Sequence, residues 1–394
     1  MDKRNLIYLF AATLFSYTTL SMLIPTFPAY VLSLGGNAAD VGLTWGAFTA
    51  GILVSRPLIG RWTDRRGRRW VMLLGTLIFS LAPLLYLVSQ SVLLLYLCRF
   101  IHGIGSAAFT TASVTLLTDC TTAENRGHTL GLMGTANNIG FALGPWLGSQ
   151  LVQTSGFTGL FLTTAAFALI SWMAALPLRE VVMPAQSRAP VSYLRAVRQR
   201  SVLLSSSILL IAAIIHTSIM TFLPLFLDER RLLGAGPYFF TLGVCMLLVR
   251  ALARPILNAQ AHRSVVGLSL LGMTIGILII VHATSSAWLL SAAILYGFSF
   301  AVIRPVLTSF LAHHTPASAR GTVFSFYEGA YDLGMSLAGI GLGLVANSFD
   351  LVVMFYLTMA VGLVGQLLSL GLTNGAEESV EWSVVLQEEQ SIHR

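Results

Sequence analysis

The segment REVVMPAQSRAPVSYLRAVRQR, residues 179–200, decides the fold, because it is the longest polar stretch in the interior of a mostly apolar chain. It contains Pro184 and Pro190, which oppose a continuous helix. Six long apolar stretches precede this segment and six follow it. We therefore predict two halves with equal numbers of helices, joined by a polar linker.

Composition places the chain in a membrane. Hydrophobic residues make up 55% of the 394 residues and charged residues 10%, and the mean hydropathy is +0.78, which is too apolar for an ordinary soluble domain. A helix needs about 20 apolar residues to cross the hydrocarbon core. The predicted spans are residues 6–33, 40–60, 71–89, 91–116, 127–152, 157–178, 202–227, 236–256, 264–283, 286–311, 321–346 and 350–372.

These spans predict an all-α membrane protein with twelve transmembrane helices in two pseudo-symmetric six-helix bundles. The bundles are residues 1–178 and 202–372, the linker is 179–201, and a polar tail occupies 373–394. The halves resemble each other weakly. Ser55-Arg56-Pro57 recurs as Ala253-Arg254-Pro255, and Pro28 corresponds to Pro224. An even number of spans separates these pairs, so we expect parallel repeats.

Positive residues are unevenly distributed among the loops. They concentrate in every second loop, which predicts cytoplasmic loops there and places both termini in the cytoplasm. The low lysine content fits a bacterial inner membrane. The same distribution explains the net charge of +7 without nucleic acid as a partner. The basic residues of the predicted cytoplasmic side are Lys3, Arg4, Arg61, Arg65, Arg66, Arg68, Arg69, Arg126, Arg179, Arg188, Arg195, Arg198, Arg200, Arg263 and Arg320.

The sequence contains no pattern typical of a cofactor or metal site. Cys98, Cys120 and Cys245 are far apart and form no Cys-x-x-Cys pair. We find no nucleotide-binding Gly-Lys-Ser/Thr loop and no cluster of metal-ligating residues. We therefore expect neither metal nor cofactor, and no enzymatic activity.

Three motifs lie in order on the predicted helices of the first half: GRWTDRRGRR at Gly60–Arg69, RFIHGIG at Arg99–Gly105 and GPWLG at Gly144–Gly148. They resemble motifs of the major facilitator superfamily and of its drug/proton antiporter branch. The resemblance implies a transporter with a central cavity that alternates in access. It also implies a cytoplasmic gating loop closing against the eleventh span, comprising Gly60, Asp64, Arg65, Gly67 and Arg68. The second half reads NAQAHR at 258–263 and lacks the acid and glycines of this loop.

The motif in the fifth span repeats glycine every four residues at Gly140, Gly144 and Gly148, with Pro145 between them. Such a stripe lets another helix approach closely. The resemblance implies a hinge shared by exporters at the same place, and the two interpretations do not exclude each other.

Two arginines lie inside predicted spans, where a lipid-facing charge costs a few kcal/mol or more. Arg99 should therefore face the cavity and have a partner. The resemblance implies proton coupling or substrate contact for Arg99, and the alternative is a structural ion pair. Arg304 could bind an anionic substrate or pair with an acid of the eleventh span. Arg56, Arg250 and Arg254 lie near helix ends, where snorkelling would explain them.

The stretch FSFYEGAYDLGMS, residues 324–336, places Glu328 and Asp332 one helical turn apart near mid-membrane. Asp332 corresponds to Asn138 in the first half. Two ionised carboxylates so close repel each other, so one is expected to bind a proton in some state. Proton coupling is one interpretation and a structural salt bridge the other. Further candidates for the cavity, each of which could be a core residue instead, are Tyr30, His102, Asn137, Asn138, His216, Tyr327 and Tyr331.

The favoured hypothesis is proton-driven export of a small amphiphilic molecule by a monomer in the lipid bilayer. The run DLGMSLAG, Asp332–Gly339, also resembles bacterial metallophore exporters, so the substrate could be drug-like or a metallophore. One alternative is a proton-coupled importer or uniporter of a small organic anion. Another is a receptor or assembly subunit that transports nothing.

Overall fold

The computed structural model describes residues 3–121, 123–180, 197–232, 234–252, 262–316 and 319–372. This part of the chain is helical and contains no strand. The helices are α1 (Lys3–Met22), α2 (Phe27–Ser33), α3 (Ala38–Arg66), α4 (Arg68–Val88), α5 (Val92–Asp119), α6 (Ala123–Ala175), α8 (Arg200–Glu229), α9 (Ala235–Leu252), α11 (His262–Val281), α12 (Ser286–His314), α13 (Arg320–Leu337), the π-helix η1 (Ala338–Leu342), α14 (Gly343–Ser348) and α15 (Leu351–Ser369).

The helix count agrees with the predicted twelve once three irregular elements are interpreted. Among the described residues, nine helices are long and apolar enough to span a membrane, and ten if α1 and α2 form one span bent by 42°. Helix α6 has 53 residues and would be about 80 Å long if straight, far more than one crossing needs. It is broken at Gly156, where φ is +64°. The short apolar helix α9 is the remaining span.

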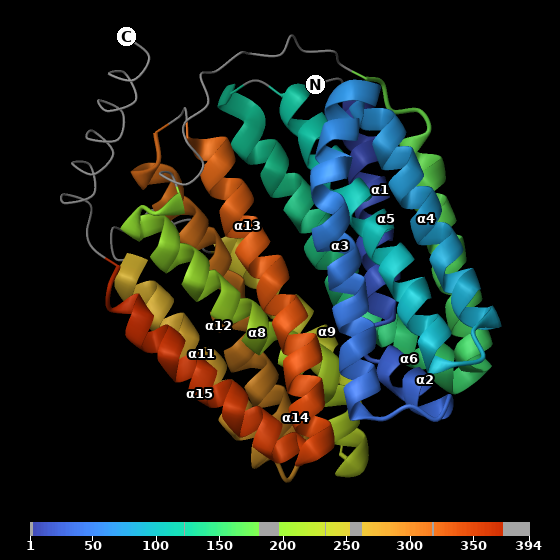
Figure 1. The fold of residues 1–394 in the computed structure, drawn as a ribbon, viewed down its shortest axis with the longest axis vertical. Coiled ribbons are helices and arrows are strands. Elements are labelled where there is room, and N and C mark those ends of the chain that lie inside the picture. The colour runs from blue at the N-terminus through green and yellow to red at the C-terminus, as the bar shows by residue number, and fades with distance from the viewer. Residues whose placement is uncertain are drawn as a thin grey trace.

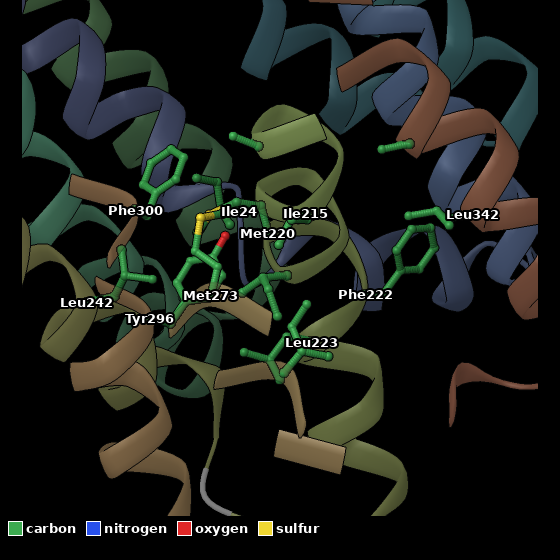
Figure 2. Packing of buried hydrophobic residues seen from close by; sticks show 14 of the residues in the cluster. Ile24, Ile215, Met220, Phe222, Leu223, Leu242, Met273, Tyr296, Phe300 and Leu342 are labelled. Atoms are coloured by element: carbon green, nitrogen blue, oxygen red, sulfur yellow. The ribbon is translucent and has the colours of Figure 1, made fainter. Parts of the chain in front are cut away.

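The two halves lie side by side, with the N-terminus at one end of the molecule and α2 and α14 at the other (Figure 1). Helix α8 is the most enclosed of the long helices, with 83% of its apolar window buried. Its buried residues join those of α11, α12 and α15 in one core, of which Figure 2 shows Met273, Tyr296 and Phe300. This core also includes Ile24 and Phe27 of the first half, so it continues across the boundary.

Glycines bring the halves together at the α2 and α14 end. A Cβ on Gly42 of α3 would overlap the carbonyl oxygen of Gly339 and come within 2.9 Å of the Gly343 Cα. Gly46, one turn further along α3, lies against Ile340. The π-helix η1 therefore packs backbone to backbone on α3. We call this contact the glycine seam.

A second contact between the halves joins α6 to α9. A side chain on Gly243 of α9 would collide with Ala142 of α6, and Gly236 lies beside Ser149. Arg250, near the other end of α9, lies against Gly134. Two pairs of helices, α3 with α13–α14 and α6 with α9, thus flank the region where the halves meet.

The outer surface carries large apolar side chains with no protein cover. Leu93 is 75% exposed, Leu268 68% and Leu367 67%. A soluble monomer rarely exposes so much apolar surface, whereas lipid tails would cover it. Residues 181–196 of the predicted linker and the predicted tail from 373 lie outside the described residues. The boundaries of the two bundles therefore stay predictions.

Candidate functional site

Asp332 forms an ion pair that connects the two halves. Helix α13 places its carboxylate Oδ2 2.9 Å from Nη2 of Arg56, which comes from α3. The Asp332 side chain is only 6% exposed. The two atoms lie at ion-pair distance but are not aligned for a hydrogen bond. The expectation that Arg56 snorkels did not include this partner, which the approach of α13 supplies while 35% of the Arg56 side chain stays exposed.

Glu328 has a different arginine. Arg304 of α12 forms an ion pair and a hydrogen bond with Glu328 through Nη2 and Oε2. The guanidinium of Arg304 also lies 4.8 Å from the ring centre of Tyr331. This pair is more accessible than the other, with 44% of the Arg304 side chain exposed. Of the two possibilities for Arg304, the structure contains the pair with a helix acid.

Two arginines therefore pair with two carboxylates. One pair lies within a single half, and the other joins the two halves. Arg304 and Glu328 belong to the same half, so their attraction does not depend on how the halves are placed. Arg56 and Asp332 belong to different halves. Because Coulomb attraction falls with distance, only the second pair loses energy when the halves separate. We call these four residues the charged cluster.

Sequence reasoning missed two neighbours of the cluster. Tyr17 of α1 interacts electrostatically with Arg56, Arg304 and Glu328. Ser336, one turn beyond Asp332, hydrogen-bonds Thr49 of α3 through the two hydroxyls at 2.8 Å. A tyrosine and a Ser–Thr pair in apolar spans give no distinctive signal, and only the helix packing brings them together.

Arg99 has aromatic neighbours where a carboxylate was one expectation. Its guanidinium lies 4.2 Å from the ring centre of Phe27, 5.0 Å from Phe48 and 5.4 Å from Trp45. The residue is 1% exposed. In the described part of the chain it forms no ion pair, and its Nε and Nη1 have no hydrogen-bond partner. The partners are therefore ring faces, which attract a cation without neutralising it, together with the Tyr86 hydroxyl, which hydrogen-bonds the guanidinium.

Tyr30 and His102 belong to the interior of the first half. The Tyr30 hydroxyl donates to the carbonyl oxygen of Tyr86 at 2.6 Å. The Tyr86 hydroxyl in turn lies 2.7 Å from Nδ1 of His102. His102 is fully buried, with its ring against those of Phe48 and Phe79. This packing favours the core alternative for both residues.

His216 and Tyr327 are buried in the second half. His216 stacks on Phe300 with the ring centres 3.8 Å apart, and its Nδ1 lies 3.3 Å from the Tyr296 hydroxyl. It interacts electrostatically with Arg304 of the charged cluster.

Tyr327 is fully buried beside Glu328 on α13. On α6, Asn138 is buried and Asn137 half-buried.

The α3–α4 loop contacts the ends of other helices in its own half. Gly67 has φ of +96°, which turns the chain between α3 and α4. The backbone N–H of Arg68 donates to Glu180, and its Nε lies 2.8 Å from an oxygen of Asp119. Arg65 is exposed and Gly60 has open space where a side chain would be. The side chain of Asp64 lies outside the described residues.

We expect Gly67→Ala to lower the free energy of unfolding by about 1–2 kcal/mol, because a residue with Cβ is strained at positive φ. Its new methyl group would also displace the Glu180 carboxylate, which lies at that position. Thermal unfolding in detergent measures the change. Gly60→Ala is the matched control, with no atom within 4 Å of its added Cβ. Equal stability of the two variants would contradict this account of the loop.

The glycine stripe of the fifth span packs on α1, within the same half. A Cβ on Gly144 would meet Ser21, and one on Gly148 would meet Met22. The Ser21 hydroxyl donates to the carbonyl oxygen of Gly140 at 2.8 Å. Pro145 lies within α6 without ending it. Close packing, one of the two interpretations, is therefore present, and the hinge stays a prediction.

A cavity of about 440 Å³ lies at the α2 and α14 end, and its polar lining comes from Ser149, Asp228 and Arg231. None of the charged cluster lines it, so we do not assign it to the site. The described residues contain no group of His, Cys, Asp and Glu that could hold a metal ion. The three cysteines are unpaired.

Comparison with known families matches this chain to the Major Facilitator Superfamily, over residues 9–339 and 258–383. Multidrug resistance protein 1 of Bacillus subtilis (strain 168) is 32% identical over 183 residues, 46% of this chain and 47% of that protein. Quinolone resistance protein NorA of Staphylococcus aureus is 26% identical over 136 residues, 34% of this chain and 35% of that protein. The chain thus spans less than half the length of these curated relatives.

Solved structures share the fold over nearly the whole chain. The human organic anion transporter MFSD10 (TETRAN) superimposes with a TM-score of 0.70 at 20% identity, covering 93% of this chain and 99% of that chain. A point mutant of the nucleoside transporter NupG gives a TM-score of 0.77 at 14% identity, covering 93% and 99%. At these identities the likeness shows the architecture alone.

Proposed function

Because this chain belongs to the Major Facilitator Superfamily, and is thus an integral membrane transporter, we propose that it exports a small amphiphilic molecule in exchange for protons. The two halves rock about the seams that join them and open the central region to each side in turn. The substrate is a drug-like compound or a metallophore. The protein lies in a bacterial inner membrane with both termini in the cytoplasm.

The observation that carries this proposal is the ion pair between Arg56 and Asp332. While Asp332 is ionised, its attraction to Arg56 stabilises the arrangement in which α3 and α13 are close. A proton on Asp332 removes that attraction. Arg56 then lacks its ion-pair partner and can bind water or substrate. The proton thereby changes the relative free energy of the two arrangements, as a coupled carrier requires.

Glu328 has a supporting role in this mechanism. Its pair with Arg304 lies within one half and persists while the halves move. Arg304 neutralises a charge that would otherwise repel ionised Asp332 one turn away. A cationic substrate group that approaches Glu328 would compete with Arg304. Glu328 is therefore a second carboxylate, after Asp332, whose partner can change during transport. The α3–α4 loop, including Asp64, gates the cytoplasmic side in our proposal.

Direction and coupling can be tested with purified protein in liposomes that have an acidic interior. Three probes would be compared: a fluorescent lipophilic cation, benzoate and an iron–siderophore chelate. We expect inward accumulation of at least one probe as protons leave, and its loss when a protonophore collapses the gradient. Movement of a probe out of the liposomes, in the same direction as the protons, would favour the importer. If none of the three probes crosses faster than in protein-free liposomes, the proposal fails in favour of the non-transporting alternative.

A further inference from the structure

Arg99 is the buried charge that the proposed coupling mechanism does not use. It lies where the two halves meet, at a small cavity lined by α2, α3, α5, α8 and the connection between α1 and α2. Ile24 and Met220, which approach each other from opposite halves in Figure 2, belong to the same lining. The site is therefore complete only while the halves are closed at this position.

The polar atoms at this cavity offer more hydrogen-bond donors than acceptors, because the Thr221 hydroxyl oxygen is the one acceptor among them. Arg99 Nε and Nη1, Trp45 Nε1 and Thr221 Oγ1 are all buried without a hydrogen-bond partner. The guanidinium and indole nitrogens can only donate, and a threonine hydroxyl can donate one proton. Thr221 is 3% exposed and Arg99 1%. Buried hydrogen-bond donors usually have partners. A group that accepts hydrogen bonds would satisfy the donors of this cavity.

The positive charge of Arg99 determines which hydrogen-bond acceptor binds best at this cavity. The rings of Phe27, Trp45 and Phe48 attract the Arg99 cation but leave its net charge in place, and no described carboxylate pairs with it. An uncompensated charge in low dielectric favours an anion over neutral water. The cavity volume is about 10 Å³, close to the smallest that holds one water-sized atom. A single atom of an anion is therefore the most that this space can admit, with a small outward shift of the lining for a larger ion, and a whole drug-sized molecule is excluded.

We propose that Arg99, Trp45 and Thr221 form a binding site for a single acceptor atom of an anion, either a halide or one oxygen of a carboxylate. Residues of both halves line the site, so an anion bound there stabilises the closed arrangement of the halves at this position by mass action. If the natural source is a carboxylate, the site receives the acidic group of the cargo, an interpretation that rests on the proposed function. A halide would instead be a resident anion.

The test uses bromide and full-length protein in nanodiscs, in gluconate buffer at constant ionic strength. Bromide quenches tryptophan fluorescence on contact, and Trp45→Phe identifies the part due to Trp45. We expect a saturable component in the wild type that Arg99→Gln abolishes. Thr221→Val should weaken bromide binding about tenfold, since it removes one hydrogen bond to a charged group. Thr217→Val is the matched control, because this equally buried hydroxyl one turn away does not line the cavity.

Competition with benzoate shows whether the site binds a carboxylate oxygen or an inorganic halide. If benzoate displaces bromide in the wild type, the site accepts a carboxylate. If bromide binds and benzoate does not compete, the site belongs to an inorganic halide. A wild type without a saturable component overturns the proposal, as does an equal loss in Thr217→Val and Thr221→Val. The assay needs neither a gradient nor flux, so its failure is separate from failure of the transport proposal.

Discussion

Asp332→Asn should lower proton-coupled transport about 100-fold, near the upper end of coupling effects between two sites. Asparagine keeps the shape of the side chain but cannot bind or release a proton, and it has no charge to attract Arg56. The variant would therefore be held in the condition of protonated Asp332. We expect substrate binding to persist, because the change removes the exchange of protons and leaves the other residues of the charged cluster unchanged. Flux into liposomes under an imposed pH gradient measures the loss.

Asp350→Asn provides the control for this prediction. It is the same chemical change in the same half, at the N-cap of α15, where the side chain accepts a bond from the backbone of Val353. Asparagine caps helices as well as aspartate does, so transport should stay near the wild-type rate. Normal coupled flux in Asp332→Asn would mean that the carboxylate is only structural and that protons, if they move, bind elsewhere.

Gly42→Ala should shift the protein away from the closed glycine seam. The added methyl group would overlap the Gly339 carbonyl and crowd Gly343. Overpacking of this kind costs about 1–3 kcal/mol, and about 2 kcal/mol changes a two-state ratio roughly 30-fold. Spin labels at Gln90→Cys and Thr284→Cys, one exposed position in each half, would report a longer distance. The native cysteines would first be replaced.

Gly341→Ala is the matched variant for the seam. It adds the same methyl group within η1, where nothing lies within 4 Å of the new Cβ. Its distance distribution should equal that of the parent protein. If Gly42→Ala and Gly341→Ala gave the same distribution, close backbone contact at Gly42 would not control how the halves meet.

The spans were predictable because their signal is local. Apolar length sets the minimum for crossing a membrane, and each described span can be recognised in its own sequence. Sequence also located the break inside α6, since the predicted spans end at 152 and begin at 157, on either side of Gly156. The π-helix η1 was not foreseen. It packs closely on Gly42 of α3 in the other half, a contact between distant segments that local sequence does not reveal.

The charged cluster was only partly predictable. Helical spacing placed Glu328 and Asp332 together, because residues four apart share a face. The partner of Asp332 could not be found this way. Arg56 lies in the other half, and its position near a helix end gave snorkelling a good local explanation. The partners of Arg99 were missed for a related reason. Its position inside a span indicated that it must have a partner, but the sequence did not show that aromatic rings from other helices would surround it.

The most direct test of the central claim is to follow protons and substrate together. Purified protein would be placed in liposomes containing a pH-sensitive dye, and the substrate found in the direction assay would be added without an imposed gradient. Exchange predicts that the internal pH changes as substrate enters, with protons leaving in a fixed ratio to substrate. Substrate entry at constant internal pH, with a membrane that holds an imposed gradient, would contradict proton coupling and with it the role proposed for Asp332.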